Sequence, residues 1–304
     1  METVCILLST YNGERFLNDQ LHSLLNQKGV NTYLIIRDDG STDSTISIIK
    51  EWKLCYPNWI FYEEGTNLGS TKSFSVLLGT ALKKFPNVQY FSFCDQDDIW
   101  LENKLAVAIE HLTKSKDSVP ALYFSNLEVV DVTLNKIELF WRKNEVQVSK
   151  PGSLVQNFAS GCTEVFNKAA AVTYIRHVTA EVSFHDYFMY QMCLFLGEVV
   201  YDDTPHILYR QHGNNQVGKK RSILRYIQFL RKPLAKTKCL ESNRIFLESF
   251  KSQLCLDDIF IFSKLLNYKD NSFSKLSLFV DNKIRFTNLK SNILLKVRIL
   301  LGLL

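Results

Sequence analysis

The amino-terminal third of the chain predicts an α/β sandwich built around a mostly parallel sheet. Three observations support this fold class. Short, continuous apolar runs alternate with segments whose apolar residues recur at helical spacing, and the connections between them are short and polar. Continuous apolar runs are typical of strands covered on both faces. Regular alternation of strands and helices is typical of α/β proteins.

The first four elements follow from local pattern. Residues 4–8 are five consecutive apolar residues and predict a buried strand. A polar turn at Asn12-Gly13 then leads into a helix over residues 16–25, where apolar residues recur every three to four positions. Residues 33–36 predict the second strand. The helix after it is expected to begin at Asp43-Ser44, because Asp and Ser commonly cap helices.

The later elements repeat this alternation and then depart from it. A short strand is expected over residues 59–62 and a helix over 70–84, followed by a strand over 90–94 and a helix over 104–112. Strand-like segments occupy residues 121–141. Helices over 169–177 and 186–196 and short strands over 198–201 and 206–209 complete this part.

The charge of the chain is unevenly distributed. The net charge of the 304 residues is +5, but residues 219–304 hold 18 Lys and Arg against 6 Asp and Glu. This part therefore carries +12 and residues 1–218 carry −7. The basic part is also rich in apolar residues at helical spacing. We expect a catalytic domain over 1–218, a hinge near 213–218 and a basic helical region over 219–304 that faces an anionic surface.

Cysteine usage and hydropathy bear on the compartment. The chain has seven cysteines, an odd number, and none form a C-x-x-C pair. This pattern predicts buried free thiols in a reducing compartment. The amino terminus lacks the basic and apolar regions of a signal peptide. No apolar run approaches the ~18–20 residues that span a bilayer. We therefore expect a cytoplasmic protein whose membrane contact, if any, is peripheral, at the inner face of the cell membrane.

Acidic residues gather where the expected strands end. Polar loops follow the four strands at residues 9–14, 38–43, 63–69 and 95–98. The carboxyl ends of parallel strands meet at one edge, where ligands bind. Asp95, Asp97 and Asp98 directly follow a buried strand, and grouped carboxylates repel unless a cation neutralises them. Mg²⁺ or Mn²⁺ takes oxygen ligands and commonly bridges carboxylates to a diphosphate.

Two common nucleotide-binding motifs are absent from the sequence. It contains no G-x-x-x-x-G-K-[ST] loop, and its first turn lacks G-x-G-x-x-G. These absences argue against an NTPase phosphate loop and against a dinucleotide-binding Rossmann site. A nucleotide diphosphate held by a metal ion, rather than by a glycine-rich cradle, is the remaining interpretation.

Four motifs, in order and each at an expected strand end, resemble glycosyltransferase family 2, whose members have the GT-A fold. They lie at residues 9–12, 38–43, 67–69 and 95–100. The resemblance covers roughly residues 2–218 and includes Gly161-Cys162-Thr163, His185-Asp186 and residues 209–215. The Asp-Gln-Asp-Asp-Ile-Trp motif and the later Arg-Gln-His-Gly-Asn-Asn are most similar to bacterial polysaccharide enzymes, including rhamnosyltransferases.

The resemblance implies which residues contact the donor nucleotide. Asp39 would accept a hydrogen bond from the N3–H of uracil or thymine, for which a carboxylate is a suitable acceptor. Asp38 beside it could instead brace the loop. Asp95 would face the ribose or the sugar, and Arg210 could pair with phosphate. The full implied set is Thr10, Tyr11, Glu14, Asp38, Asp39, Asn67, Asp95 and Arg210.

The resemblance also implies a metal site and a catalytic base. Asp97 and Asp95 would hold Mg²⁺ or Mn²⁺, with His212 as a candidate third ligand. Asp98 is either a further ligand or a cap for the helix over 104–112. Inverting transfer needs a base that takes the proton of the acceptor hydroxyl. Asp186 has the position of that base, and His185 is either an alternative base or a residue that shapes the pocket.

These expectations describe an inverting, metal-dependent enzyme. It would move a sugar from a dTDP- or UDP-sugar to a growing cell-surface polysaccharide, such as a capsule, on a lipid-linked acceptor. Two alternatives stay open. One is a metal-dependent nucleotidyltransferase, which would leave Asp186 without a role. The other is a catalytically inactive family member that serves as a membrane-bound assembly subunit.

The basic carboxyl-terminal region predicts an amphipathic helix. A continuous apolar stripe at spacings of three and four consists of Phe286, Leu289, Ile293, Val297, Leu300 and Leu304. Such a helix suits the interface of an anionic membrane, where each nearby basic residue adds ~1 kcal/mol. The alternative is that the stripe packs on the catalytic domain as ordinary core. Nucleic acid is not expected as a partner, because the aromatic residues do not form stacking platforms.

Overall fold

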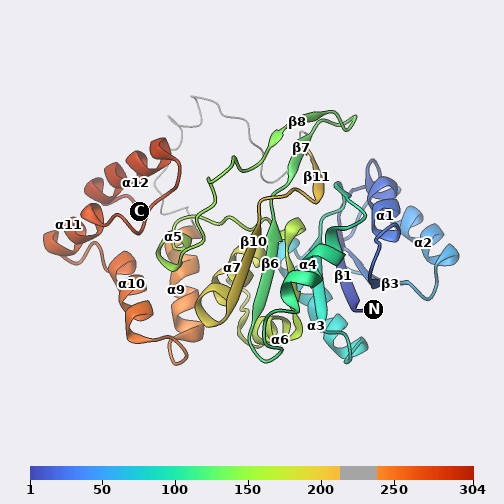
Figure 1. Cartoon of the computed structure of the whole chain (residues 1–304), viewed down its shortest axis with the longest axis horizontal. Helices are drawn as coiled ribbons and strands as arrows, with labels where there is room; N and C mark the ends of the chain where they lie inside the picture. The colour runs from blue at the N-terminus through green and yellow to red at the C-terminus, as the bar shows by residue number, and fades with distance from the viewer. Residues whose placement is uncertain (213–237) are drawn as a thin grey trace. The chain divides into compact units, whose positions relative to one another are not determined.

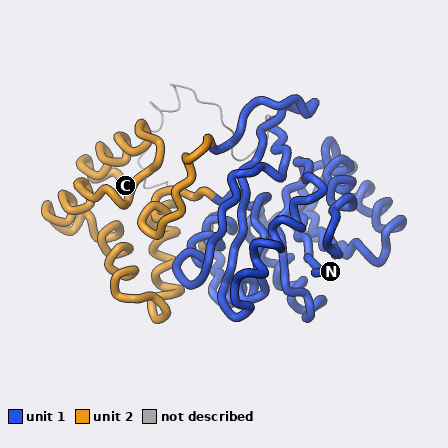
Figure 2. The backbone as a smooth tube through the Cα atoms, viewed as in Figure 1, with its two compact units in different colours: residues 1–141, 159–180, 184–212 blue, residues 142–158, 181–183, 213–304 orange. Residues whose placement is uncertain are grey.

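The computed structural model describes residues 1–212 and 238–304, which fall into two units (Figures 1 and 2). Unit 1 comprises residues 1–141, 159–180 and 184–212. Unit 2 comprises residues 142–158 and 181–183 together with the described carboxyl-terminal residues. The expected domain boundary at residue 218 and the hinge at 213–218 lie outside the described residues. So do Lys219, Lys220, Arg221, Arg225, Arg231 and Lys232.

A seven-stranded sheet forms the centre of unit 1, with strand order β10-β6-β9-β4-β1-β2-β3. All neighbouring pairs are parallel except those of β9, which lies antiparallel between β4 and β6. The α/β class with a mostly parallel sheet is therefore confirmed. The strands are β1 (Thr3–Thr10), β2 (Asn31–Asp38), β3 (Ile60–Glu64), β4 (Tyr90–Cys94), β6 (Ala121–Ser125), β9 (Val165–Asn167) and β10 (Glu198–Asp202).

Helices cover both faces of this sheet, because its strands bury alternate residues on opposite sides. Val4, Ile6 and Leu8 join a core cluster with residues of α1, α2 and α4. Cys5 and Leu7 point the other way and are equally buried. On that side α3, α6 and α7 contact one another. The helices are α1 (Leu17–Leu25), α2 (Thr45–Cys55), α3 (Ser70–Lys84), α4 (Lys104–Leu112), α6 (Lys168–His177) and α7 (His185–Leu196).

A smaller four-stranded sheet also belongs to unit 1, with strand order β5-β11-β7-β8. Its strands are β5 (Ile99–Trp100), β11 (Ile207–Arg210), β7 (Glu128–Val130) and β8 (Lys136–Leu139). β5 directly follows the Asp-rich loop after β4, and β11 pairs with it. This pairing brings the segment that ends at His212 back to the loop at residues 95–98. The two-residue β5 and the three-residue β9 are too short to show a periodic pattern, and the sequence did not predict them.

Unit 2 is helical in the part of it that the structure describes. Its helices are α5 (Lys150–Ser153), α9 (Lys238–Phe250), α10 (Leu256–Leu266), α11 (Ser272–Val280) and α12 (Leu289–Leu301). Residues 142–158 belong here because α5 is tied to the later helices. Nζ of Lys150 forms an ion pair with Asp258 at 2.8 Å, and Nδ2 of Asn243 donates to the carbonyl of Leu154 at 2.8 Å. None of the described helices is long and apolar enough to cross a membrane.

The cysteines are all free thiols, but not all are buried. Cys5, Cys94, Cys162 and Cys193 lie in the interior, as predicted. Cys55 and Cys255 are exposed, so the prediction of uniformly buried thiols was wrong. Both sit at helix ends, Cys55 as the last residue of α2 and Cys255 as the N-cap of α10, where side chains reach solvent more readily than in mid-strand.

Candidate active site

The carboxyl ends of β1, β2 and β4 meet at one edge of the large sheet. Thr10, the last residue of β1, lies beside Asp38 at the end of β2. Leu8 of β1 lies beside Cys94, which ends β4 and precedes Asp95. The prediction that the polar loops after these strands meet at one edge is therefore confirmed.

Hydrogen bonds join the loop after β1 to its neighbours. The side-chain oxygen of Asn12 accepts from the amide of Thr42 at 2.9 Å. Glu14 accepts from the amide of Ser44 at 2.9 Å, so its carboxylate holds the loop after β2. Gln96 bonds both the amide and the carbonyl of Tyr11, at 2.9 and 3.0 Å. The side chain of Tyr11 itself is 47% exposed at this edge and stays available to a ligand.

Asp38 acts as the brace of the loop after β2. Its Oδ1 accepts from the amides of Gly40 and Ser41, at 3.0 and 2.7 Å. Its Oδ2 accepts from the hydroxyls of Thr10 and Ser41, at 2.8 and 2.6 Å. The side chain is fully buried. Four donors occupy the acceptor sites of a carboxylate, so of the two roles left open for Asp38 the structure favours bracing.

Asp39 is bound differently from its neighbour. Its Oδ2 accepts from the amides of Leu68 and Gly69, at 3.0 and 2.8 Å, and its Oδ1 pairs with the guanidinium of Arg37. Asn67 caps the same turn, since its Oδ1 accepts from the amide of Gly69 at 3.1 Å. Sequence reasoning missed Arg37. The available signal was a charged residue directly after the apolar run at residues 34–36.

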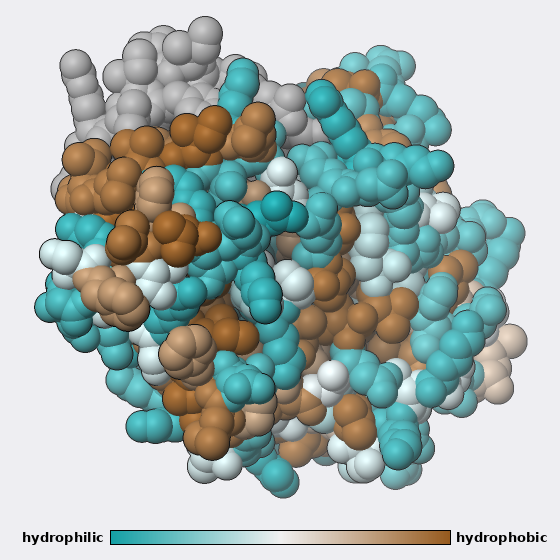
Figure 3. Space-filling view, turned by 60° about the vertical axis from the view of Figure 1, so that its left-hand side comes forward, coloured by the Kyte–Doolittle hydropathy of each residue, from teal (hydrophilic) through white to brown (hydrophobic). Residues whose placement is uncertain are grey.

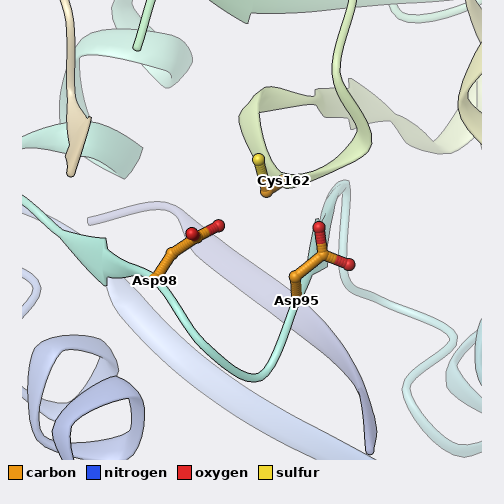
Figure 4. Close-up of side chains that lie close together, drawn as sticks. All are labelled: Asp95, Asp98 and Cys162. Carbon is orange, nitrogen blue, oxygen red and sulfur yellow. The ribbon is translucent and has the colours of Figure 1, made fainter. Parts of the chain in front are cut away.

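Asp95, Asp98 and Cys162 lie close together (Figure 4). Their ligand atoms lie within 4.8 Å of one another, and among the described residues this is the one such group of three. Burial, with the charges of Asp97 and Asp186, raises the pKa of Asp95 to about 7. Burial also raises the pKa of Asp98 well above its ordinary value.

Asp97 and His212 lie together beside this group. Nε2 of His212 is 2.7 Å from Oδ2 of Asp97. The structure thus brings together two of the three residues expected to hold a metal ion, and it places the third, Asp95, with Asp98 and Cys162. Asp98 does not cap α4, whose N-cap is Asn103. Instead its Oδ1 accepts from the amide of Arg210 at 3.2 Å.

Arg210 holds the Asp-rich loop after β4 through hydrogen bonds. The side chain is buried, and its Nε donates to the carbonyl of Asp97 at 3.1 Å. One terminal nitrogen donates to the carbonyl of Val132 at 3.0 Å, and the other forms an ion pair with Asp19 at 3.0 Å. Through these contacts the Arg210 side chain connects β11 to the loop after β7 and to α1. A phosphate would have to compete with them for the guanidinium.

Asp186 is the second residue of α7, and its charge acts on the acidic edge of the sheet. Its Oδ1 accepts from the amide of Tyr187 at 2.7 Å. Its charge is one of the causes that raise the pKa of Asp95, so the two carboxylates face a common region. Asp95 and Asp186 both belong to unit 1.

His185 is packed rather than solvated. Its ring stacks on Phe74 with centroids 4.2 Å apart and meets Phe93 edge-on at 4.8 Å. Burial lowers the pKa of His185 to about 3, so its imidazole is neutral near pH 7. Its Nε2 is buried without a hydrogen-bond partner among the described residues. Of the two roles left open for His185, this setting favours shaping the pocket.

Two charged side chains behind the acidic edge were missed by sequence reasoning. Lys104 is fully buried, donates to the hydroxyl of Ser92 at 3.1 Å and lies 3.5 Å from the ring centroid of Trp100. Burial lowers its pKa to about 7. Glu164 is fully buried, and burial and the charge of Asp186 raise its pKa well above the ordinary value. The residues next to Lys104 and Glu164 do not mark either as buried, so only the fold reveals their surroundings.

The donor set fits a divalent cation in part. Oδ2 of Asp98 is buried without a hydrogen-bond partner among the described residues, and burial, followed by the charges of Asp97 and Asp186, raises the pKa of Asp95. Carboxylate oxygens are the ligands that Mg²⁺ and Mn²⁺ prefer. The thiol of Cys162 is a softer donor than these ions prefer. We therefore regard Asp95 and Asp98 as the residues best suited to hold a cation, with Asp97 beside them.

The sequence is similar to a known protein family and to named bacterial enzymes. The model of the family described as Glycosyl transferase family 2 matches residues 5–174. The dTDP-rhamnosyl transferase RfbG of Shigella flexneri is 31% identical over 224 residues, which cover 69% of this chain and 73% of that protein. WfgD of Escherichia coli, named UDP-Glc:alpha-D-GlcNAc-diphosphoundecaprenol beta-1,3-glucosyltransferase, is 26% identical over 53% of this chain and 58% of its own length.

The fold agrees with solved structures of more distant sequence. The crystal structure of S. aureus TarS residues 1–349 in complex with UDP-GlcNAc matches with a TM-score of 0.57 at 16% identity. The match covers 93% of this chain and 77% of that one. The complex of the same TarS segment with UDP matches with a TM-score of 0.56. At this identity the likeness establishes the GT-A fold.

Proposed function

Because this chain belongs to glycosyltransferase family 2, we propose that it moves a sugar from a dTDP- or UDP-sugar to a growing cell-surface polysaccharide, with inversion at the anomeric carbon. The observation that carries this proposal is the proximity of Asp186 to Asp95 at the carboxyl edge of the sheet, where burial and the charges of Asp97 and Asp186 raise the pKa of Asp95. One can face the donor while the other faces the acceptor. The chain is thus a glycosyltransferase whose substrates are inferred.

The donor nucleotide would lie against the loops after β1, β2 and β3. Tyr11 offers an exposed aromatic face there, and Asp39 offers a carboxylate for an N3–H. Thr10, Asp38, Glu14 and Asn67 hold these loops in place through the hydrogen bonds described above. The pocket would therefore be built before the donor arrives, which lowers the ordering cost of binding.

Asp95 and Asp98 would hold a Mg²⁺ or Mn²⁺ ion, with Asp97 and His212 beside them. Held there, such an ion would supply positive charge for the diphosphate as it departs. The unpartnered Oδ2 of Asp98 supports this assignment. The direct contact of Asp97 with His212 suggests that the histidine orients this carboxylate.

Asp186 would act as the base. Its carboxylate takes the proton of the acceptor hydroxyl as that oxygen bonds to the anomeric carbon. The bond from this carbon to the diphosphate oxygen breaks, and a nucleoside diphosphate leaves. His185, neutral and held between Phe74 and Phe93, positions the start of α7. Inversion follows because the base and the leaving group lie on opposite sides of the sugar.

The relatives support the choice of substrates. RfbG is named for a dTDP-rhamnosyl donor, and WfgD for a diphosphoundecaprenol acceptor. We therefore place a dTDP-sugar, with rhamnose as the first candidate, above UDP-sugars. We propose a lipid-linked glycan as the acceptor.

A donor panel tests the proposal. The chain is incubated with Mn²⁺ or Mg²⁺, a polyprenyl-diphosphate glycan and each nucleotide sugar. We expect release of a nucleoside diphosphate with one donor, and an inverted anomeric configuration in the product by NMR. Release of pyrophosphate would instead establish nucleotidyl transfer. Absence of turnover with every donor, in a chain that still binds nucleotide, would support an inactive assembly subunit.

The carboxyl-terminal helix supports a peripheral membrane location. Four members of the predicted stripe on α12 are exposed: Leu289 by 71%, Ile293 by 56%, Val297 by 39% and Leu300 by 50%. The opposite side, with Leu295 and Ile299, is buried. Leu304 departs from the stripe, since it is buried and hydrogen-bonded to Tyr268. Four of the six stripe residues therefore face solvent. Figure 3 shows a group of hydrophobic side chains in the upper left of that view.

An anionic lipid surface is the partner we propose for this stripe. Exposed apolar residues continue on α11, where Phe273, Leu276 and Val280 reach solvent. Between residues 281 and 304 the chain has five basic residues against one acidic residue. Apolar side chains at the acyl boundary with nearby basic groups are the composition of an interfacial helix. The same location would give the enzyme access to a lipid-linked acceptor.

Vesicle co-sedimentation tests this location. The full chain should pellet with vesicles that contain phosphatidylglycerol and stay in solution with purely zwitterionic ones. Replacing Ile293 and Val297 by Ser should lower the vesicle partition constant at least about 100-fold, since each buried apolar side chain contributes ~1.5–3 kcal/mol and a factor of ten corresponds to ~1.4 kcal/mol. The matched control is Leu54→Ser on α2, an exposed apolar residue outside the stripe. Unchanged pelleting of the double variant would contradict the proposed location.

A further inference from the structure

We propose that Arg37 is a positioning residue for nucleobase selection. Its buried guanidinium holds the carboxylate of Asp39 in the orientation that favours uracil or thymine over cytosine. The inference rests on the proposed function, in which Asp39 accepts the N3–H of the base. It adds the residue that makes this contact selective.

Arg37 joins three segments of the donor edge. Arg37 is the penultimate residue of β2, and its side chain is almost completely buried. One terminal nitrogen pairs with Oδ1 of Asp39 and lies 3.2 Å from the hydroxyl of Ser73 on α3. The other donates to the carbonyl of Thr66 at 2.9 Å. The guanidinium therefore fixes Asp39, the loop after β3 and the start of α3 relative to one another.

The loop after β3 is built to admit this side chain. A Cβ at Gly65 would overlap Nη2 of Arg37 and lie 2.9 Å from its Cζ. The amide of Gly65 is also tied to the carbonyl of Asp38 at 3.0 Å, so the loop has little room to move away. Glycine at this position is thus explained by the close approach of the guanidinium, and its φ is not in the left-handed region.

The contacts leave Asp39 with one open acceptor position. An ionised carboxylate has about four lone-pair sites. Two N–H groups of Leu68 and Gly69 occupy Oδ2, and Arg37 occupies one site of Oδ1. A carboxylate held on both oxygens cannot rotate to suit a different ligand. Uracil and thymine present an N–H at N3, whereas cytosine presents a lone pair there, which the fixed carboxylate repels.

Lysine is not expected to replace Arg37. The planar guanidinium reaches three acceptors at once, on Asp39, Ser73 and Thr66, with donors in a rigid fork. An ammonium on a flexible chain places its donors at a single point. Arg37→Lys keeps the positive charge but loses the forked arrangement of donors. The variant therefore distinguishes orientation of the Asp39 carboxylate from simple neutralisation of its charge.

Calorimetric titration of the full chain with UDP, dTDP and CDP tests the inference. The wild type should bind UDP and dTDP more tightly than CDP. Arg37→Lys should reduce the ratio of UDP affinity to CDP affinity about tenfold. The affinity for CDP itself should change less than the affinity for UDP. Gly65→Ala, which disturbs Arg37 without removing it, should reduce the ratio in the same direction. Gly79→Ala is the control, because its added Cβ meets no atom within 4 Å.

The outcomes separate this inference from the proposed function. Asp39→Asn is measured in parallel. If Asp39→Asn abolishes the selectivity while Arg37→Lys and Gly65→Ala keep it, Arg37 has no positioning role and the proposed function stands. If Asp39→Asn also keeps it, the nucleobase role of Asp39 fails. A merely structural defect would weaken UDP and CDP binding equally. Should Arg37→Lys not fold, the ratio measured with Gly65→Ala decides the question.

Discussion

Gly161 lets the imidazole of His185 approach the turn that precedes β9. A Cβ at residue 161 would lie 2.8 Å from Nε2 of His185 and 3.4 Å from Cβ of Asp186. The short helical turn Gly161–Thr163 and the first residues of α7 are therefore packed without spare room. Because the proposed base, Asp186, follows His185 directly, a larger side chain at residue 161 should displace Asp186 and lower the rate of sugar transfer.

Substituting Gly161 by alanine should lower activity more than stability. The added methyl displaces His185 and with it Asp186, and a displacement near 1 Å can cost about 100-fold in rate. Overpacking of this kind costs about 1–3 kcal/mol of stability. Turnover and urea denaturation of Gly161→Ala measure the two effects. The control Gly79→Ala, with open space around its new methyl, should retain full turnover; equal activity of the two variants would contradict the prediction.

The buried imidazole of His185 should weaken the fold at acidic pH. Its pKa is lowered to about 3, whereas in an unfolded chain a histidine has a pKa near ~6.5. As pH falls from 6.5 toward 3, the unfolded chain therefore takes up a proton that the folded chain does not. Stability from this residue is lost in that window.

His185→Gln should remove this acid-side loss. Between pH 7 and pH 4.5 the wild type should lose about 2–3 kcal/mol more than the variant, by the linkage of pKa to stability. Urea denaturation at the two pH values measures the difference. The pH profile of turnover, in contrast, should keep its shape in the variant, because a neutral imidazole does not titrate there. A shifted acidic limb would assign His185, rather than Asp186, to proton transfer.

Asp186→Asn should abolish turnover and spare donor binding. An amide cannot take a proton from the acceptor hydroxyl, and loss of a general base typically costs about 10²–10⁴-fold. The Kd of the nucleoside diphosphate should change little, since the base faces the acceptor. Single-turnover kinetics and titration of the nucleotide provide the two measurements. Asp117→Asn, at an exposed turn, is the matched control and should behave as wild type.

Lys104 should make the fold more stable as pH rises above neutrality. Its pKa is lowered to about 7, below the ~10.4 of an unfolded lysine. Between these values the unfolded chain binds a proton that the folded chain has already released, so unfolding becomes less favourable with rising pH. Lys104→Met should lose this gain, which amounts to roughly 3 kcal/mol between pH 7 and 9.5. Identical pH slopes in the two chains would show that Lys104 is solvated; the exposed Lys114→Met is the control.

Local pattern predicted most elements of unit 1. Helices α3 and α4 and strand β4 begin and end at the expected residues, because each combines a clear apolar period with a polar boundary. The acidic loops were placed at one edge because parallel strands share a direction. Strand β9 was not predicted, since three residues carry no period and its antiparallel place between β4 and β6 is a long-range pairing.

The site was predicted by residue type, and the structure distinguishes the roles of those residues. Asp38 and Asp39 are adjacent carboxylates in the sequence, yet one is a loop brace and the other is held by Arg37. Asp98, left open between ligand and cap, lies with Asp95 and Cys162. The stripe on α12 was recognised from its spacing, but spacing does not tell which side faces solvent.

The sequence by itself determined the fold class, the family resemblance and the edge of the sheet where the chemistry lies, because these depend on local periodicity and on motifs that each span a few residues. Only the tertiary structure decided which donors each carboxylate meets, which charges are buried and which apolar stripe is exposed. Those properties depend on groups up to 191 positions apart in the chain, such as Asp19 and Arg210. Burial and the proximity of other charges, which set the pKa of Asp95, His185 and Lys104, arise only once the chain is folded.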